Sequence, residues 1–107
     1  MGNMTINIAN DFTTTPGARY IKDGPFSGEE FRQKFLEQYF KNPKDESIIE
    51  VILDGTEGYA TSFLEEAFGG LARIFGKERC LKKLKLTSIE DGVLIKEIQG
   101  YIEKCDG

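Results

Sequence analysis

Residues 48 to 71 read IIEVILDGTEGYATSFLEEAFGGL, and this stretch decides the fold that we expect. It opens with an apolar run, Ile48 to Leu53, that ends at Asp54. A continuous run of β-branched and other apolar residues is typical of a strand that is buried on both faces of a sheet. We therefore predict a central strand from Ile48 to Asp54.

A short loop and a helix follow the predicted strand. Ser62 and Glu65 match the Ser-x-x-Glu pattern of a capping box, in which the serine side chain accepts a hydrogen bond at the helix start. The predicted helix runs from Phe63 to Phe75, and Gly76 ends it in the left-handed conformation that glycine allows. Its apolar residues form one stripe: Leu64, Ala67, Phe68, Leu71, Ala72 and Phe75. In α/β proteins such a junction is where ligands and partners bind, so we look for function here.

Strands and helices alternate along the rest of the chain. Ser27 and Glu30 form a second capping box, at the start of a helix that ends at Asn42-Pro43. The other predicted elements are strands over Thr5–Ala9, Arg19–Lys22 and Leu81–Thr87 and a last helix over Asp91–Cys105. This order predicts an α/β fold, a small β(β)αβαβα domain with a mostly parallel sheet of about four strands and three helices. A length of 107 residues suits a single domain, residues 1–107.

Composition and charge exclude several classes of function. The formal net charge is −4, which argues against non-specific binding to nucleic acid, because that needs a basic surface. No apolar run approaches the roughly 20 residues of a membrane helix, and no secretory signal is visible. The chain has no histidine and only two cysteines, which removes imidazole catalysis and most zinc sites. We expect a cytoplasmic protein that binds neither membranes nor a metal.

Thr61 and Ser62, at the predicted helix start, are candidate phosphorylation sites. The free N–H groups and the dipole of a helix N-terminus keep such a junction polar, and a phosphate adds about 1.5–2 negative charges. The alternative for Ser62 is structural, since a capping serine stabilises a helix by about 1 kcal/mol. Thr61 is not needed for the capping box and is the freer hydroxyl. The expected partner-binding surface consists of Tyr59, Ala60, Thr61, Ser62 and Glu65.

Asp54 is a second candidate. A carboxylate at the end of a central strand could accept a phosphoryl group or bind Mg²⁺ with help from Asp11, because hard cations prefer clustered oxygens. The alternative is a turn formed by Asp54 and Gly55, the commonest role of that dipeptide.

Two further features have both a structural and a functional explanation. Gly69-Gly70 within the predicted helix costs about 1 kcal/mol per glycine, which predicts close approach of the helix to the sheet or to a partner. A basic cluster in this acidic chain either meets an acidic partner or guards a solvated strand edge against aggregation. The cluster consists of Lys77, Arg79, Lys82, Lys83 and Lys85.

The segment around Thr61 also resembles a known family. A strand that ends in Asp54 and is followed by a loop and a hydroxyl pair resembles the core of STAS domains. This is the fold of anti-sigma factor antagonists. In those proteins a partner kinase phosphorylates a serine in the corresponding turn. Closer still is a STAS-like family of unknown function, with a hydroxyl residue before the motif F-L-x-E-A-F-G-x-L. FLEEAFGGL (63–71) matches that motif, and FSGEEFR (26–32) matches the start of its first helix. The resemblance runs from about residue 19 to residue 104.

The resemblance implies a non-enzymatic binding module without a cofactor. Its partner would be a protein such as a histidine-kinase-like ATPase of the anti-sigma type, which contacts the helix from Phe63 and the loop before it. Phosphorylation of Thr61 or Ser62 would then weaken the grip of an acidic partner through like-charge repulsion. The alternative is a receiver-like phosphoacceptor domain that uses Asp54 with Mg²⁺. The sequence leaves the oligomeric state open.

Overall fold

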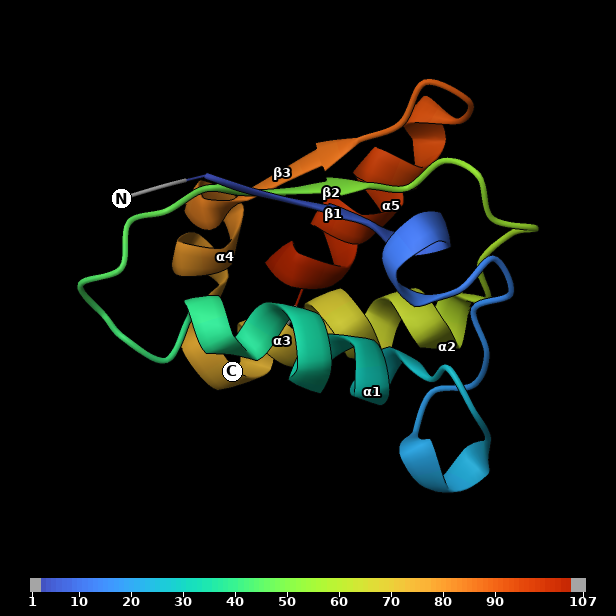
Figure 1. Ribbon diagram of the computed structural model, residues 1–107. Coiled ribbons are helices and arrows are strands. Elements are labelled where there is room, and N and C mark those ends of the chain that lie inside the picture. The colour runs from blue at the N-terminus through green and yellow to red at the C-terminus, as the bar shows by residue number, and fades with distance from the viewer. Residues whose placement is uncertain (1–2, 105–107) are drawn as a thin grey trace.

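Three parallel strands form the sheet, which lies along the top of the molecule in Figure 1. They are β1 (Met4–Asn7), β2 (Ile49–Ile52) and β3 (Leu84–Thr87), in the order β1-β2-β3. The computed structural model describes residues 3–104. The predicted parallel sheet, with the strand after residue 48 at its centre, is confirmed.

The fourth predicted strand, Arg19–Lys22, is not found in the described residues. Residues 17 to 27 form a projecting loop instead, which we call the 17–27 loop and which contains the short 3₁₀ turn η2 (Ile21–Asp23) (Figure 1). Backbone hydrogen bonds close its base: the Gly17 N–H donates to the Phe26 carbonyl at 2.8 Å, and Gly28 to Ala18 at 2.9 Å. These groups are satisfied within the same segment, so they do not extend the sheet beside β1.

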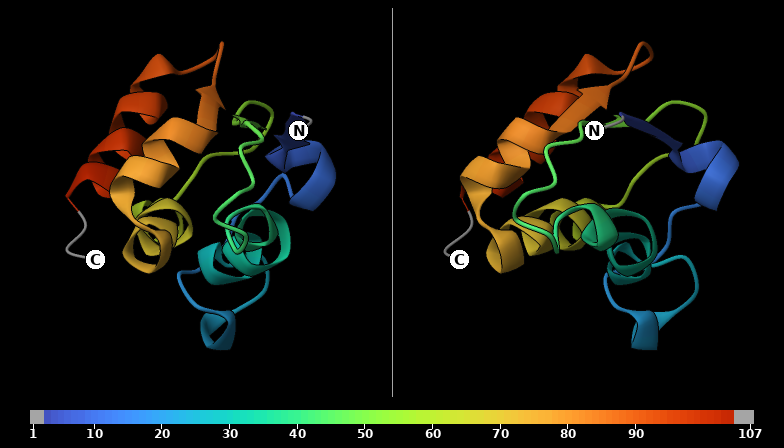
Figure 2. Two further views of the ribbon diagram at one scale, coloured as in Figure 1. Left: turned by 90° about the vertical axis from the view of Figure 1, so that its left-hand side faces the viewer. Right: turned by 60° about the vertical axis from the view of Figure 1, so that its left-hand side comes forward.

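The helices pack against one face of the sheet, and the views in Figures 1 and 2 show none over the other face in residues 3–104. The burial of β2 alternates accordingly: Ile49 and Val51 are fully buried, whereas Glu50 and Ile52 are half-buried. The prediction that this strand is buried on both faces is therefore wrong. Ile52 pairs with Asn7 and Thr87 on the open face, where a β-branched side chain fits a pleated surface without a helix above it.

The helix after β2 starts earlier than predicted. It comprises α2 (Thr61–Leu64), a π-helical turn η5 (Glu65–Gly69) and α3 (Gly70–Phe75), and its backbone stays helical across both junctions. We call this continuous segment the 61–75 helix. Gly76 ends it with φ +98°, as predicted. The predicted apolar stripe is confirmed, with Phe75 only partly buried against the core.

The segment after Gly76 differs from the prediction. A helix, α4 (Lys77–Lys83), occupies residues that were partly assigned to the strand Leu81–Thr87, so β3 begins only at Leu84. Cys80 and Lys83, three residues apart, are both buried, which fits a helix and not the alternation of a strand. The last helix, α5 (Gly92–Glu103), follows Asp91, whose carboxylate accepts a hydrogen bond from the Val93 N–H at 3.1 Å. Its predicted end at Cys105 lies outside the described residues.

The first helical segment begins at Ser27, as predicted. Its parts are α1 (Gly28–Phe31), the π-helical turn η3 (Arg32–Leu36) and the 3₁₀ turn η4 (Glu37–Tyr39). The Ser27 hydroxyl is buried and accepts a hydrogen bond from the Glu30 N–H at 3.0 Å. Gly28 lets this segment approach the 61–75 helix closely, since a Cβ there would lie 2.3 Å from the Phe63 carbonyl oxygen.

One hydrophobic core lies between the sheet and the helices. Its largest fully buried rings are those of Phe31, Phe40, Phe63 and Phe68. Phe31 contacts both Phe63 and Phe68, with ring centroids 6.2 Å apart in each pair, so aromatic packing joins the first helical segment to the 61–75 helix. Among residues 3–104, no helix has the length and apolar character needed to cross a membrane.

Candidate functional site

Asp54 follows β2 and is engaged by the loop between β3 and α5. Its carboxylate accepts hydrogen bonds from the Ile89 N–H at 2.7 Å, the Ser88 hydroxyl at 2.7 Å and the Glu90 N–H at 3.1 Å. The hydrogen bond from Ile89, with that from Ser88, lowers the pKa of Asp54. Three donors already use this carboxylate, so Asp54 ties two neighbouring loops together.

Asp11 also has a structural partner. It lies in the π-helical turn η1 (Ile8–Phe12), and its carboxylate accepts a hydrogen bond from the Asn7 N–H at 2.8 Å. No group of three or more acidic, cysteine or histidine side chains within residues 3–104 is placed to hold a metal ion. The geometry therefore gives no support to a phosphoacceptor site built from Asp54, Asp11 and Mg²⁺.

Tyr59 holds the loop between β2 and α2 in place. Its hydroxyl donates to the Leu53 carbonyl at 2.7 Å, and its ring packs on Phe63 with centroids 5.9 Å apart. Burial raises the pKa of Tyr59 to about 12. Tyr59 is thus half-buried, and its main effect is to position Ala60 and Thr61 at the surface.

Thr61 and Ser62 lie at the accessible start of the 61–75 helix. Ala60 is the N-cap residue and makes no side-chain hydrogen bond to the helix, so the prediction that Ser62 is the cap is wrong. Thr61 is exposed and Ser62 half-buried. Neither hydroxyl is used by a hydrogen bond within residues 3–104. The structure therefore removes the structural alternative for Ser62 and leaves both hydroxyls available for chemistry.

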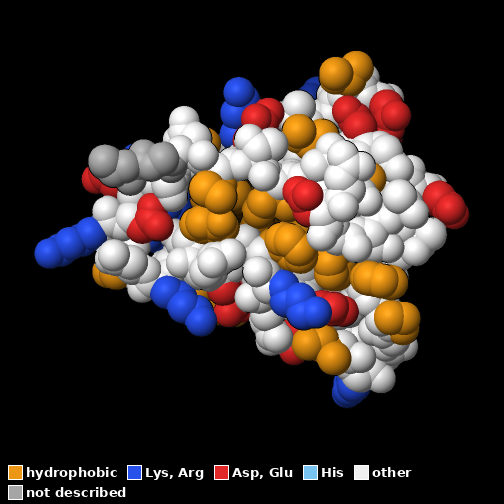
Figure 3. Space-filling view, in the orientation of Figure 1, with side chains coloured by type: hydrophobic (Ala, Val, Ile, Leu, Met, Phe, Trp, Pro, Cys, Tyr) orange, Lys and Arg blue, Asp and Glu red, His pale blue; other side chains and the backbone are white. Residues whose placement is uncertain are grey.

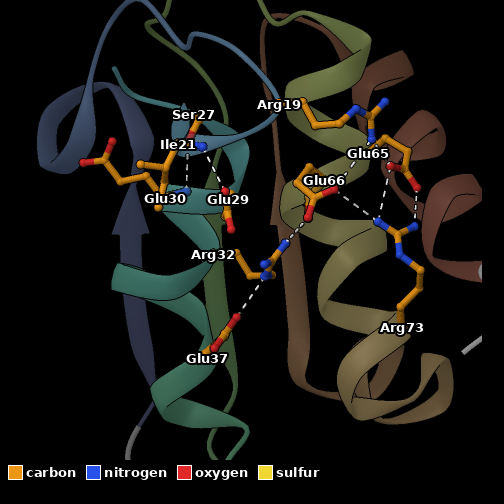
Figure 4. Close-up of polar contacts among 10 residues, drawn as sticks. All are labelled: Arg19, Ile21, Ser27, Glu29, Glu30, Arg32, Glu37, Glu65, Glu66 and Arg73. Atoms are coloured by element: carbon orange, nitrogen blue, oxygen red, sulfur yellow. Dashed lines mark hydrogen bonds and ion pairs between the residues drawn. The ribbon is translucent and has the colours of Figure 1, made fainter. Parts of the chain in front are cut away.

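Glu65 does not complete a capping box, and its carboxylate is engaged by two arginines. Arg19 from the 17–27 loop and Arg73 from α3 both form ion pairs with it (Figure 4). The hydrogen bond from Arg73 lowers the pKa of Glu65, and Arg19 adds to this effect against the opposing effect of burial. Glu65 is thus only partly available to a partner. It belongs to a charged network of six residues: Arg19, Arg32, Glu37, Glu65, Glu66 and Arg73.

Glu66 extends the network into the protein. Its carboxylate accepts a hydrogen bond from the buried Arg32 side chain at 2.6 Å, and Arg32 also donates to the Glu66 carbonyl at 2.9 Å and to Glu37 at 2.9 Å (Figure 4). Burial opposes the charge of Arg32, but its hydrogen bonds to Glu37 and Glu66 prevail and raise its pKa. Ion pairs and hydrogen bonds of Arg32 thereby connect the first helical segment to the 61–75 helix, in addition to the aromatic packing described above.

The glycine pair within the helix makes room for these arginines. A Cβ at Gly70 would lie 2.5 Å from the Arg32 Nη1 atom, and one at Gly69 would lie 2.8 Å from the Glu65 carboxylate. The prediction that Gly69-Gly70 allows close approach to the sheet or to a partner is not met, because the nearest atoms belong to side chains of Arg32, Glu65, Glu66 and Arg73. Sequence reasoning missed this network because its members lie far apart in the chain.

The basic cluster is largely structural. Lys83 is 3% exposed, and its ammonium group donates to the carbonyls of Asp45 at 2.8 Å and Ser47 at 2.9 Å. Arg79 donates to the Asn42 carbonyl at 2.7 Å. These two residues fasten the loop before β2, and of the five only Lys85 lies on a strand. The explanation of a lysine-guarded strand edge can therefore apply to Lys85 alone, and both it and the acidic partner stay predictions.

An acidic cleft of about 350 Å³ lies beside the helix start, at the carboxyl end of the sheet. Its acidic lining residues are Asp54, Glu57, Glu90, Asp91 and Glu97. Figure 3 shows acidic side chains over the loops at this end of the molecule. Ile89, whose N–H donates to Asp54, has 92% of its surface exposed. Sequence reasoning overlooked the cleft, although loops that follow neighbouring parallel strands meet at one edge of a sheet.

The fold and the site define a class: a small α/β domain with a parallel sheet, helices over one face, and free hydroxyls at the helix start that follows the central strand. A family model described as a STAS-like domain of unknown function (DUF4325) matches residues 27–94, more than half of the chain. The chain belongs to this STAS-like family, and the predicted resemblance is confirmed. No curated protein and no solved structure matches the chain.

Proposed function

We propose that this STAS-like domain is a regulatory protein-interaction module whose partner-binding surface includes the start of the 61–75 helix. One observation carries the proposal: Thr61 is exposed, Ser62 is half-buried, and neither hydroxyl is used by a hydrogen bond within residues 3–104. In this proposal the protein acts in the cytoplasm by binding and not by catalysis. Its partner is a histidine-kinase-like ATPase of the anti-sigma type.

Phosphorylation is the proposed switch. The γ-phosphoryl group of ATP moves to the side-chain oxygen of Ser62 or Thr61: a new P–O bond forms, the bond to ADP breaks, and the hydroxyl proton leaves to a base of the kinase. A phosphate adds about 1.5–2 negative charges at neutral pH. It would lie at a helix N-terminus, whose dipole stabilises negative charge.

The acidic cleft argues for a partner with a basic surface. Glu57, Glu90 and Asp91 are exposed beside the helix start and would repel an acidic partner. The acidic partner expected from the sequence is therefore replaced by a basic one in this proposal. A phosphate then adds to the attraction, so phosphorylation strengthens binding, and the strengthening is largest at low salt because salt screens exposed charges.

The proposal is tested with a histidine-kinase-like ATPase of the anti-sigma type from the same cell. The full chain is incubated with that ATPase and ATP, and phosphate is mapped by mass spectrometry. We expect label on Ser62 or Thr61, and none in the control variant Thr61→Val/Ser62→Ala. Label on another residue, or label that persists in the control variant, contradicts the proposed switch.

A binding titration tests the charge of the partner. Glu57→Gln/Glu90→Gln removes two exposed charges of the cleft, and Glu103→Gln, on the exposed end of α5, removes one charge outside the cleft. We expect the cleft variant to weaken binding of the ATPase several-fold at low salt and the α5 variant to leave it unchanged. Tighter binding by the cleft variant would show that the partner surface is acidic.

A further inference from the structure

Arg19 lies beside the start of the 61–75 helix, and we propose that it is the internal receptor for a phosphate on Ser62. In this role it passes the phosphorylation state of Ser62 to the 17–27 loop. The inference rests on the proposed function, because it concerns the state that follows phosphorylation.

The position of Arg19 along the helix supports this role. Arg19 and Arg73 approach Glu65 from opposite ends of the helix (Figure 4). Arg73 lies eight residues after Glu65, toward the C-terminal end. Arg19 therefore approaches from the side of Thr61 and Ser62, and its guanidinium group also lies 3.7 Å from the Glu66 carboxylate.

Helix geometry selects Ser62 over Thr61. Glu65 and Glu66 follow Ser62 by three and four residues, so both share its side of the helix, whereas Thr61 shares a side with Glu65 only. The two carboxylates lean toward the following turn, since a Cβ at Gly69 would lie 2.8 Å from one oxygen of Glu65 and a Cβ at Gly70 would lie 3.2 Å from one oxygen of Glu66. Arg19 contacts both carboxylates from the side opposite Arg73, so a phosphate on Ser62 would lie about one helical turn from its present partners (Figure 4).

Moving Arg19 to a phosphate leaves no buried charge without a partner. Glu65 keeps its ion pair with Arg73, and Glu66 keeps the hydrogen bond from Arg32 at 2.6 Å. A phosphate carries more charge than a single carboxylate, and arginine binds phosphate oxygens with paired hydrogen bonds. The exchange therefore avoids the large penalty that follows when one member of a buried ion pair is removed.

The 17–27 loop is the element that responds. The carbonyl of Arg19 accepts a hydrogen bond from the Glu29 N–H at 3.0 Å, which fixes its backbone to α1. The next two residues, Tyr20 and Ile21, are exposed, and the Arg19 guanidinium lies 6.0 Å from the centre of the Tyr20 ring. A shift of Arg19 toward Ser62 changes this contact and so repositions an apolar tip beside the partner-binding surface.

The test uses the full chain with phosphoserine inserted at position 62 during translation, so that no kinase is needed. Titration followed by ³¹P NMR gives the second pKa of the phosphate, which is ordinarily about 6. Arg19→Gln should raise this pKa by about one unit, because a cation within ~4–6 Å favours the doubly charged form. Arg73→Gln is the matched control, because Arg73 also pairs with Glu65 but lies on the side away from Ser62. This variant should raise the pKa of the phosphate clearly less. Equal rises in the two variants, or none in Arg19→Gln, overturn the inference.

Amide NMR shifts of Tyr20 and Ile21 provide the second measurement. Phosphoserine at position 62 should shift both signals in the chain with Arg19 and leave them in place in Arg19→Gln. Signals that do not move in either chain show that the loop does not respond. Both results are independent of the partner ATPase, so a failure to find phosphate on Ser62 after incubation with ATP refutes the proposed function and not the affinity of Arg19 for phosphate.

Discussion

The chain contains the pattern Ser-x-x-Glu at two helix starts, and the structure uses it in two different ways. Ser27 is buried, caps its helix and accepts a hydrogen bond from the Glu30 N–H at 3.0 Å. Ser62 lies inside the first turn of its helix and caps nothing. The matching glutamates differ as well: Glu30 accepts a hydrogen bond from the Phe26 N–H at 3.1 Å, next to the cap, whereas Glu65 binds Arg19 and Arg73.

The difference follows from where each helix starts: with Ala60 as the N-cap, Ser62 is the second helical residue and Glu65 the fifth, so neither occupies its position in a capping box. Within residues 3–104, the one charged partner of Glu30 is Lys34, four residues later and largely exposed. The Glu30 carboxylate also accepts the hydrogen bond from the Phe26 N–H. Glu65 has two arginines, one of them 46 residues away in the sequence. The helix of Glu65 starts at Thr61 and not at Phe63, the start predicted from the capping box, and Ser62 caps nothing. The second start is therefore the one at which we propose phosphorylation.

The largest expected effect comes from breaking the charged link between the two helices. Arg32→Met leaves the buried Glu66 without its closest partner and should lower the free energy of unfolding by about 3–5 kcal/mol. The double variant Arg32→Met/Glu66→Leu removes both charges and should recover most of this loss. Urea denaturation measures all three proteins. A loss of less than about 1 kcal/mol in Arg32→Met would mean that the network does not hold the two helices together.

A smaller effect is expected from Gly28→Ala, which forces the two helix starts apart. The new Cβ would lie 2.3 Å from the Phe63 carbonyl oxygen, and we expect a loss of about 1–3 kcal/mol, the usual cost of overpacking. Gly100→Ala, in α5, is the matched control: no atom lies within 4 Å of its Cβ position, so the change should stabilise by up to about 1 kcal/mol through helix propensity. Thermal denaturation should move the two variants in opposite directions.

The direct comparison of the two serines comes next in size. Ser27→Ala removes a buried cap and should cost about 1–2 kcal/mol. Ser62→Ala removes a hydroxyl with no internal hydrogen bond and should stay within about 0.5 kcal/mol of the wild type. Equal losses in chemical denaturation would show that Ser62 caps its helix in solution.

The smallest effect concerns pH. The pKa of Glu65 is lowered in the folded protein, so its contribution to stability is present above its ordinary pKa and is lost as pH falls through the folded pKa. Glu65→Gln should therefore be less stable than the wild type at neutral pH, and the gap should close in acid. A gap that stays constant in unfolding curves down to pH 3 would indicate that loss of packing, and not of charge, causes the difference.

Local patterns predicted the elements whose partners are close in sequence. The apolar run at residue 48 gave the central strand, and Ser27 and Gly76 marked one helix start and one helix end, because caps depend on neighbouring backbone. The family motif of residues 63–71 identified the fold. In the site, the loop and its two hydroxyls were predicted, whereas the role of Ser62 as cap was not correct.

The failures all involve partners that are distant in the sequence. Helix α4 was missed because LKKLKLT alternates like a strand, while the structure uses Lys83 and Arg79 to bind carbonyl groups of residues 42 to 47. The strand expected at residue 19 became a loop whose Arg19 reaches the 61–75 helix. Single-sequence patterns cannot supply such pairings, since they depend on which surfaces the completed fold brings together.

The hydrogen bond between Asp11 and the Asn7 N–H bears on aggregation of the protein at high concentration. The Met4 N–H bonds to the Ile48 carbonyl, so by alternation the Asn7 N–H points away from the sheet, where an incoming chain would dock. Asp11 occupies that donor and brings a negative charge to an otherwise uncharged border. This contact thereby disfavours edge-to-edge pairing of β1 with a strand of another molecule, although β1 itself carries no proline or lysine.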